Sequence, residues 1–218
     1  VGSKVVVGSG CSIGDQCVIG DHTVIHQRVS LYRRTKVGKH CVIHSGAVLG
    51  ASGFGYERDE KGDGVYFPQN GGVSVGDHVD IGANTSIDCG TFGDTRLDDG
   101  VKCDNLVQIG HNVKVGAHTH ISGCSAVGGG TVIGAYCTIG GGVSISDNLT
   151  ITEKVLLAGV SVVLRSIDKP GVYASSNLAE PIDKWRKNAL TYGSLSEMAK
   201  RLKTVEKALR LNSENTKS

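Results

Sequence analysis

Residues 1–49 read VGSKVVVGSGCSIGDQCVIGDHTVIHQRVSLYRRTKVGKHCVIHSGAVL, and every sixth residue from Val1 to Leu49 is a small aliphatic. The same period resumes over 75–87 and again over 97–163, where Cys103 is the only exception. An α-helix repeats every 3.6 residues and a simple strand every two, so neither gives a strict hexad. A hexad is the signature of a parallel β-helix, a solenoid whose coils stack on one another.

Three hexapeptides make one triangular coil, with the aliphatic side chain of each hexad pointing inward. A second inward position lies two residues earlier and carries small side chains such as Cys17, Thr23 and Ala47. Many of the 32 glycines follow the aliphatic, where a corner needs unusual backbone angles. Hexapeptide solenoids coil left-handed, against the usual crossover rule. The expected fold class is therefore all-β, a left-handed parallel β-helix with a helical tail.

The chain divides into three segments by composition. We expect the solenoid over 1–165 with an insertion loop at 51–74, a linker over 166–182, and C-terminal helices over 183–218. Ser194 and Glu197 form a predicted capping box that opens the longer helix. Heptad spacing along that helix predicts a seam that needs partners, and a solenoid with three flat faces suits a trimer. The seam residues are Leu195, Met198, Leu202, Val205 and Leu209.

Charge and cysteine content exclude several classes of protein. No apolar run is long enough to span a bilayer. The seven cysteines include no C-x-x-C pair, which disfavours a metal site and predicts reduced thiols in the cytoplasm. The whole chain carries a net charge of +2, and we expect no nucleic-acid partner. Basic residues nevertheless gather in the tail over 183–218, which indicates either an acidic partner or an ordinary solvated helix face.

Two interruptions of the hexad are the places to look for function. The first, 51–74, contains Gly53-Phe54-Gly55-Tyr56 in a chain with few aromatics. Its aromatic side chains indicate either the wall of a binding site or a staple that fixes the loop to the solenoid. The second interruption lies near 91–96.

Histidines are the candidates for acid–base chemistry. Four of them, His22, His40, His78 and His118, occupy outward corner positions and are expected to be solvated. His111 differs, because it follows a regular Ile109-Gly110 pair within a polar segment. Asp104, seven residues earlier, could converge with it at one corner and raise its basicity, as suits a general base. A buried, unreactive His111 remains the alternative.

Several segments together resemble a known family, the UDP-3-O-acylglucosamine N-acyltransferases of lipid A biosynthesis. The likeness extends over nearly the whole chain. Its most specific motifs combine the Gly-Phe-Gly-Tyr insertion with Ile-Gly-His-Asn. The segments that carry it are Ser45–Gly50, Gly53–Tyr56, Ile81–Asp88, Asp104–Asn105, Gln108–Asn112, Lys169–Tyr173 and Trp185–Lys187.

The resemblance implies a homotrimer with active sites between subunits. Such an enzyme moves an (R)-3-hydroxyacyl chain from acyl carrier protein to the 2-amino group of the UDP sugar. It needs no cofactor beyond the carrier's phosphopantetheine. His111 would be the general base, Asp104 would orient it, and the Gly129 N–H would bind the thioester oxyanion.

The same resemblance also implies which residues contact the substrate, the acyl chain and the carrier protein. Substrate contacts would come from Phe54, Tyr56, Asn105, Asn112 and Asn148. The acyl-chain pocket would fall on Val162 and Leu164, near the end of the solenoid. The basic tail would bind the acidic carrier protein through Lys184, Arg186, Lys187, Lys200, Arg201 and Lys203.

Two departures from the family pattern leave alternatives open. Asn148 stands where the family has a second His, and an amide cannot titrate. The family's N-terminal uridine-binding domain is missing, and since the hexads already run in full stride at Val1, we expect that something precedes it. The alternatives are a coenzyme A-dependent hexapeptide acyltransferase acting on another amino sugar and a non-catalytic trimeric scaffold.

Overall fold

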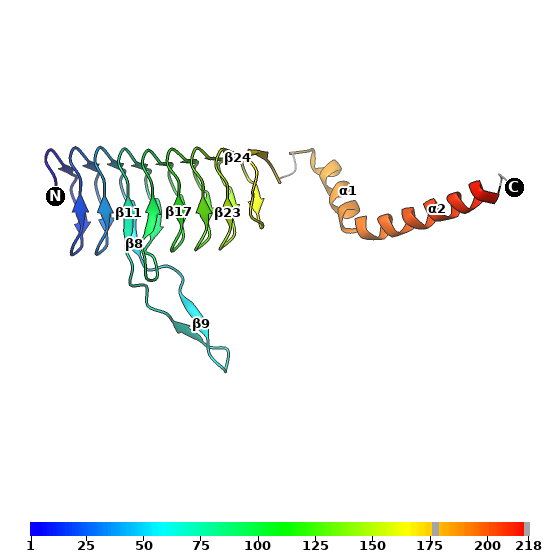
Figure 1. The fold of residues 1–218 in the computed structure, drawn as a ribbon, viewed down its shortest axis with the longest axis horizontal. Coiled ribbons are helices and arrows are strands. Elements are labelled where there is room, and N and C mark those ends of the chain that lie inside the picture. The colour runs from blue at the N-terminus through cyan, green and yellow to red at the C-terminus, as the bar shows by residue number, and fades with distance from the viewer. Residues whose placement is uncertain (176–178, 216–218) are drawn as a thin grey trace. The chain divides into compact units, whose positions relative to one another are not determined.

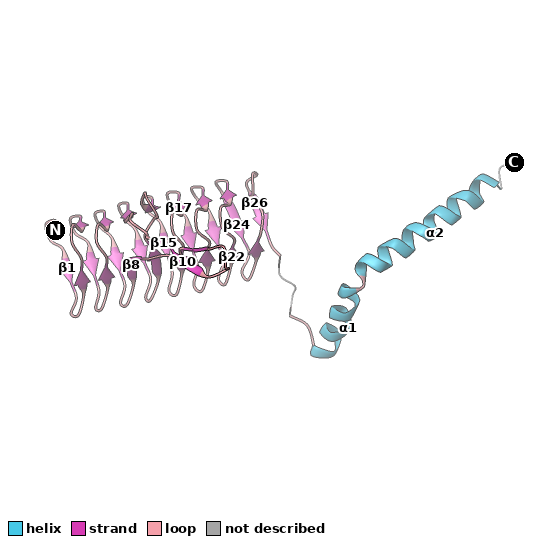
Figure 2. Cartoon of the chain, turned by 90° about the horizontal axis from the view of Figure 1, so that it is seen from below, coloured by secondary structure: helices cyan, strands magenta, loops and turns pink. Residues whose placement is uncertain are grey.

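A computed structural model describes residues 1–175 and 179–215, with side chains up to 209. The chain forms two compact units, Val1–Ser176 and Asn177–Ser218. The first is a solenoid of short parallel strands arranged as three faces of a triangular coil (Figures 1 and 2). The left-handed parallel β-helix with a helical tail that the hexads predict is therefore confirmed.

Strands of two to four residues stack along each face, with one shift of register between β13 and β8. The first face contains β1 (Val6–Val7), β4 (Val24–Ile25), β7 (Val42–Ile43), β12 (Asp80–Ile81), β15 (Lys102–Cys103), β18 (His120–Ile121), β21 (Thr138–Ile139), β24 (Val155–Leu157) and β26 (Gly171–Tyr173). The second contains β2 (Ser12–Ile13), β5 (Ser30–Leu31), β8 (Val48–Ala51), β13 (Ser86–Asp88), β16 (Gln108–Ile109), β19 (Ala126–Val127), β22 (Ser144–Ile145) and β25 (Val162–Val163). The third contains β3 (Val18–Ile19), β6 (Lys36–Val37), β11 (Val73–Val75), β14 (Thr95–Leu97), β17 (Lys114–Val115), β20 (Val132–Ile133) and β23 (Thr150–Ile151).

The predicted inward positions form the core. Ile43, Ile87 and Ile109 are fully buried, and each such side chain contributes roughly 1.5–3 kcal/mol. The second inward position is buried too, and its small polar side chains satisfy corner carbonyls. Thr23 Oγ1, for example, donates to the Gly38 carbonyl at 2.8 Å. A core built this way needs no large side chains, which explains the low aromatic content.

Each corner is turned by one residue in the left-handed region, repeated from coil to coil. The corner between the third and first faces uses His22, His40 and His78, with φ from 55° to 59°. The corner between the first and second faces uses Asn84 and Leu106, among others. The corner between the second and third faces, called here the site corner, uses Gln16, Arg34, Asn112, Gly130 and Asn148.

Both insertions leave the solenoid at the site corner. The first follows β8 and contains an antiparallel hairpin of β9 (Tyr56–Arg58) and β10 (Gly64–Tyr66), which projects from the coils in Figure 1. The second follows β13 and returns at β14. Since β8, β13 and β16 are consecutive neighbours on the second face, His111 lies at the same corner on the very next coil.

The second unit contains two helices, α1 (Ile182–Gly193) and α2 (Leu195–Asn215). Helix α2 begins where predicted, but the Ser194 hydroxyl donates backward to the Thr191 carbonyl at 2.8 Å instead of capping α2. The five seam residues of the heptads are all exposed, between 48% and 63%. The stretch expected to be a linker also differs from the prediction, because β26 within it pairs with β24.

Candidate functional site

His111 lies half-buried at the site corner, immediately after β16, and both insertions contact it or its neighbour. A Cβ placed on Gly53, in the first insertion, would lie 3.0 Å from the His111 Cβ and 3.2 Å from its Cδ2. Any larger residue at position 53 would therefore press on the imidazole, which would have to shift slightly. The second insertion reaches His111 through Asn112.

The Nδ1 atom of His111 is bound by Asn112. Asn112 Oδ1 lies 3.1 Å from His111 Nδ1, and it also accepts from the Thr91 backbone N–H at 3.0 Å. The Thr91 hydroxyl lies 2.8 Å from the same oxygen and 2.9 Å from Gln69 Oε1. The backbone N–H of Asn112 donates to Thr95 Oγ1 at 2.8 Å. The orientation of His111 is therefore set by residues at both ends of the second insertion.

The other ring nitrogen of His111 points toward the backbone of the next coil. A Cβ placed on Gly129 would lie 2.5 Å from His111 Nε2. The Gly129 carbonyl accepts from the Asn148 N–H at 2.8 Å, whereas within 1–175 and 179–215 its own N–H has no hydrogen-bond acceptor. The imidazole of His111 therefore lies against the backbone of Gly129, whose N–H is unpaired within the described residues. A base and an oxyanion donor are the two groups that acyl transfer needs.

Asp88 supplies a carboxylate close to the imidazole. Because Ile87 pairs with Ile109, Asp88 lies one coil away from Gly110 at the end of β13. Burial raises the pKa of Asp88, while a hydrogen bond with Gln108 and the charge of His111 oppose that rise.

Within the single chain, Asp104 and His111 lie at different corners and do not converge, and the orienting role that the resemblance gives Asp104 stays a prediction. Asp104 lies at the corner between the first and second faces, one strand away. Its Oδ1 accepts from the Asn105 N–H at 2.7 Å and its Oδ2 from the Gly123 N–H at 3.0 Å. Asn105 Oδ1 accepts from the Ala83 N–H at 2.6 Å. Seven residues amount to a whole strand plus a turn, so within this chain both side chains brace a neighbouring corner.

The other predicted substrate contacts differ in how near they lie to His111. Asn148 is exposed at the site corner, stacked on Gly130 of the preceding coil. Phe54 and Tyr56 follow Gly53, their rings 5.1 Å apart, and 86% and 53% exposed. The side-chain oxygen of Asn112, by contrast, contacts His111 and Thr91.

Val162 and Leu164 lie near the end of the solenoid, as predicted for an acyl-chain pocket. Both are exposed, at 53% and 72%, and both line a shallow hollow of about 350 Å³. Tyr173 of β26 and Ile167 complete its apolar wall. In the single chain this hollow is mainly apolar and open on one side.

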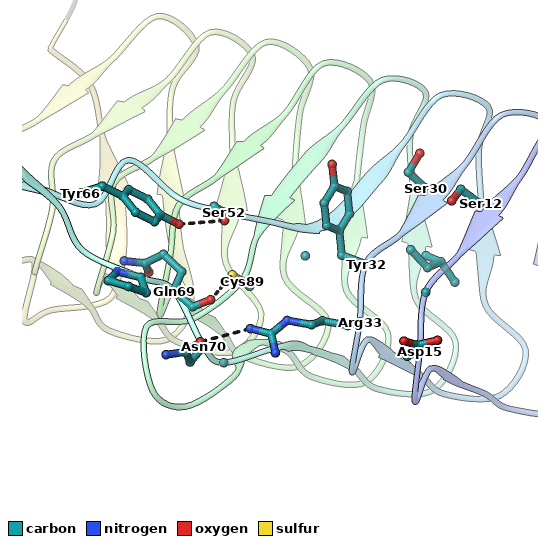
Figure 3. A pocket seen from close by; sticks show the side chains of 15 residues that line it. Ser12, Asp15, Ser30, Tyr32, Arg33, Ser52, Tyr66, Gln69, Asn70 and Cys89 are labelled. Carbon is teal, nitrogen blue, oxygen red and sulfur yellow. Dashed lines mark hydrogen bonds between the residues drawn. The ribbon is translucent and has the colours of Figure 1, made fainter.

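A larger hollow of about 580 Å³ lies between the first insertion and the second face (Figure 3). Arg33 and Asn70 meet in it at 3.2 Å, and the Tyr66 hydroxyl bonds Ser52 at 3.2 Å. Gln69, only 7% exposed, lies between this hollow and Thr91. The contact between Arg33 and Asn70 thus attaches the first insertion to the solenoid, and the Tyr66 ring lines the hollow between them.

The basic side chains predicted to bind carrier protein are all exposed on α1 and α2. Lys184 forms an ion pair with Glu180 at 3.0 Å. Among the described residues, no helix is long and apolar enough to cross a membrane. Nor do those residues contain a cluster of three or more His, Cys, Asp or Glu side chains suited to a metal ion.

Sequence reasoning missed Gln69, Asp88 and Thr91. The signal that could have found Asp88 is the phase of the repeat, counted as whole coils. Asp88 follows Ile87, which pairs with Ile109 one coil later, just before Gly110 and His111. Gln69 and Thr91 carry no such signal, because each lies within an insertion whose path the repeat does not determine.

Comparison with known proteins agrees with this architecture. A family model for the bacterial transferase hexapeptide (six repeats) matches residues 16–51. Among solved structures, a UDP-N-acetylglucosamine O-acyltransferase from Moraxella catarrhalis superposes with a TM-score of 0.71 at 24% identity, covering 85% of this chain and 71% of that one. The family model thus matches a short part of the solenoid, and the likeness to the solved structure shows the same fold.

Curated relatives narrow the relationship. UDP-3-O-acylglucosamine N-acyltransferase from Coxiella burnetii is 44% identical over 182 residues, covering 84% of this chain and 53% of the relative. The enzyme of that name from Pseudomonas putida is 52% identical over 179 residues, covering 82% and 51%. The resemblance inferred from the sequence is confirmed: over the matched residues the chain is homologous to these N-acyltransferases. It spans about half the length of the curated relatives.

Proposed function

We propose that this chain carries the acyl-transfer site of a UDP-3-O-acylglucosamine N-acyltransferase. It would move an (R)-3-hydroxyacyl chain from acyl carrier protein to the sugar's 2-amino group. The observation that carries the proposal is the pairing of His111 Nε2 with the free N–H of Gly129, in a chain homologous to such enzymes.

The reaction follows from these two groups. The amine nitrogen attacks the thioester carbonyl carbon, and His111 Nε2 takes a proton from that nitrogen. The carbonyl oxygen becomes an oxyanion, which the Gly129 N–H stabilises. The carbon–sulfur bond then breaks, and the carrier's thiolate takes the proton from the His111 imidazolium. An amide and a free thiol result, and His111 returns to its neutral form.

The remaining contacts belong to the same proposal. Asn148 at the site corner and the rings of Phe54 and Tyr56 would bind the acceptor. Val162 and Leu164 would contact the acyl chain. The exposed seam of α2 and the open hollows support a homotrimer, in which a neighbouring subunit would close the site. Light scattering should give three times the mass of one chain, and a monomer would contradict this.

The basic side chains of α1 and α2 would meet the acidic carrier protein. All six are exposed, and only Lys184 is engaged in an ion pair of the described chain. Such charges mainly raise association rates.

A donor-competition assay tests the function. The full chain is given UDP-3-O-acylglucosamine with the acyl chain on acyl carrier protein or on coenzyme A, and N-acylated product is measured by mass spectrometry. Transfer from the carrier, abolished by His111→Ala, is expected. Preference for coenzyme A would favour another hexapeptide acyltransferase, and no transfer from a well-folded trimer would favour a scaffold.

A further inference from the structure

Three polar atoms meet at the side-chain oxygen of Asn112. The Thr91 backbone nitrogen lies at 3.0 Å, the Thr91 hydroxyl at 2.8 Å and His111 Nδ1 at 3.1 Å. An Asn amide can usually be turned around, since its oxygen and nitrogen look alike, so its orientation must be argued from its partners.

The Thr91 backbone decides that orientation. A backbone N–H is always a donor, so the atom facing it has to be an acceptor. If the amide of Asn112 were turned around, its NH₂ would face the Thr91 N–H, two donors at hydrogen-bond distance. Oδ1 therefore faces both Thr91 and His111. Because that oxygen can only accept, a neutral His111 must carry its proton on Nδ1.

We propose that Asn112, fixed by Thr91, locks His111 in the tautomer protonated at Nδ1, so that Nε2 carries the lone pair. Asn112 is then a positioning residue and not a substrate ligand. The consequence for catalysis rests on the proposed function, whereas the tautomer itself does not. Nε2 is the nitrogen that faces Gly129, so the lock directs the base toward the place where the amine and thioester would meet.

The second insertion gains a role from this arrangement. Thr91 binds the side chain of Asn112, and Thr95 accepts from its backbone N–H at 2.8 Å, so both ends of the insertion clasp one residue. Asn112 has φ of 60°, a left-handed conformation that Asn tolerates better than most residues. Gln69 of the first insertion contacts Thr91 from the other side at 2.9 Å. Residues of both insertions thus help to fix Asn112, and through it the protonation site of the His111 imidazole.

The tautomer can be measured directly by nitrogen NMR of the full chain labelled in histidine, at a pH where His111 is neutral. We expect His111 to show a protonated Nδ1 and an unprotonated Nε2. Asn112→Gly, which keeps the left-handed backbone without strain, should remove this preference. The matched control is Asn84→Gly, another left-handed Asn, with φ of 55° at a different corner. A proton on Nε2 in the wild type, or an unchanged tautomer in Asn112→Gly, would overturn the proposal.

A second variant tests the proposal even if Asn112→Gly fails to fold. It distinguishes an effect on the His111 proton from a purely structural role of Asn112. Asn112→Asp preserves the shape and the acceptor, so the proton should stay on Nδ1. The added negative charge, next to that of Asp88, should keep His111 protonated to higher pH and move the acid limb of kcat/KM upward. An unmoved His111 titration in this variant would contradict a direct contact in solution.

The kinetic effect follows from the same geometry. Asn112→Gly should lower kcat by about 10- to 100-fold, in the range found for residues that orient a functional histidine, with little change in KM. If a variant no longer prefers the tautomer protonated at Nδ1 but keeps the wild-type kcat, the tautomer preference does not contribute to catalysis. If the wild type transfers no acyl group but keeps the Nδ1 proton, the proposed function fails and the tautomer lock stands.

Discussion

Two corners of the same solenoid carry histidines, and they differ in what surrounds the rings. At the corner between the third and first faces, His22, His40 and His78 stack with ring centroids 4.8 and 5.0 Å apart and planes within 6°. Within the described parts of the chain, none of these three rings has a side-chain hydrogen bond. At the site corner, His111 has Asn112 on one nitrogen and the Gly129 backbone beside the other.

The comparison teaches that the repeat supplies positions and the interruptions supply chemistry. A regular corner places equivalent side chains one above the other, so each imidazole there stacks on another ring, as His118 does on Tyr136. The site corner breaks this pattern because two consecutive coils send out insertions there. The loops bring Gly53 and Thr91 to positions that no hexad residue could occupy. Function in this fold therefore follows from where the solenoid is irregular.

The largest expected difference between the two corners is in turnover. His111→Ala should lower kcat by roughly two to four orders of magnitude, the usual range for a general base, while substrate binding changes less. His40→Ala, at the regular corner, should leave kcat unchanged. Steady-state acyl transfer checks both. A His111→Ala variant with more than about a tenth of wild-type activity would remove this residue from the mechanism.

The next largest effect should come from the backbone that faces Nε2. Gly129→Ala would place a methyl group 2.5 Å from His111 Nε2, so the ring must move. A displacement of about 1 Å at a reacting group can cost about 100-fold in rate. Gly141→Ala is the matched control, since its Cβ would meet nothing closer than 3.4 Å. Equal rates for the two variants would show that the close approach at Gly129 has no catalytic role.

A stability difference should reveal the buried carboxylate near the site. Burial raises the pKa of Asp88 above its ordinary 3.8, so the folded chain binds its proton more tightly than the unfolded chain does. The stability that this proton supplies is present below pH 3.8 and lost as pH rises through the folded pKa. Asp88→Asn should therefore raise the free energy of unfolding at pH 7, and the gain should shrink toward pH 3.8. Urea titrations at several pH values measure it, and a destabilised variant at pH 7 would show that charge attraction to His111 outweighs burial.

The smallest effect concerns the tail. Reversing Lys200 and Arg201 to Glu should raise KM for the acyl donor several-fold at low salt, because rim charges steer association. Salt should erase the difference, since screening acts within about 8–10 Å. KM for the acceptor should stay constant. The control changes Lys4 and Lys154, at the corner between the third and first faces, to Glu. An equal rise in KM there would show that only the net charge of the chain matters, and not the position of the charges in the tail.

The sequence predicted which residues lie near the site, but it did not predict the hydrogen bonds between them. The hexad places His111 on a corner, and Gly129 follows one coil later by simple counting. Asp104 shows where counting fails. Seven residues suggest proximity along the chain, but they cross a strand to another corner, where both carboxylate oxygens bind backbone N–H groups. The partner of Nδ1 proved to be the residue next to it in sequence.

The sequence by itself determined the solenoid, its inward residues and the start of α2, because burial of small aliphatics at a fixed period admits one stacking of coils. It also indicated the resemblance to N-acyltransferases that the curated relatives bear out. Only the tertiary structure decided which groups touch His111. Those contacts depend on how two insertions fold back onto one corner, and the path of a loop is set by its own hydrogen bonds, such as that from Thr91 to Asn112, rather than by the repeat.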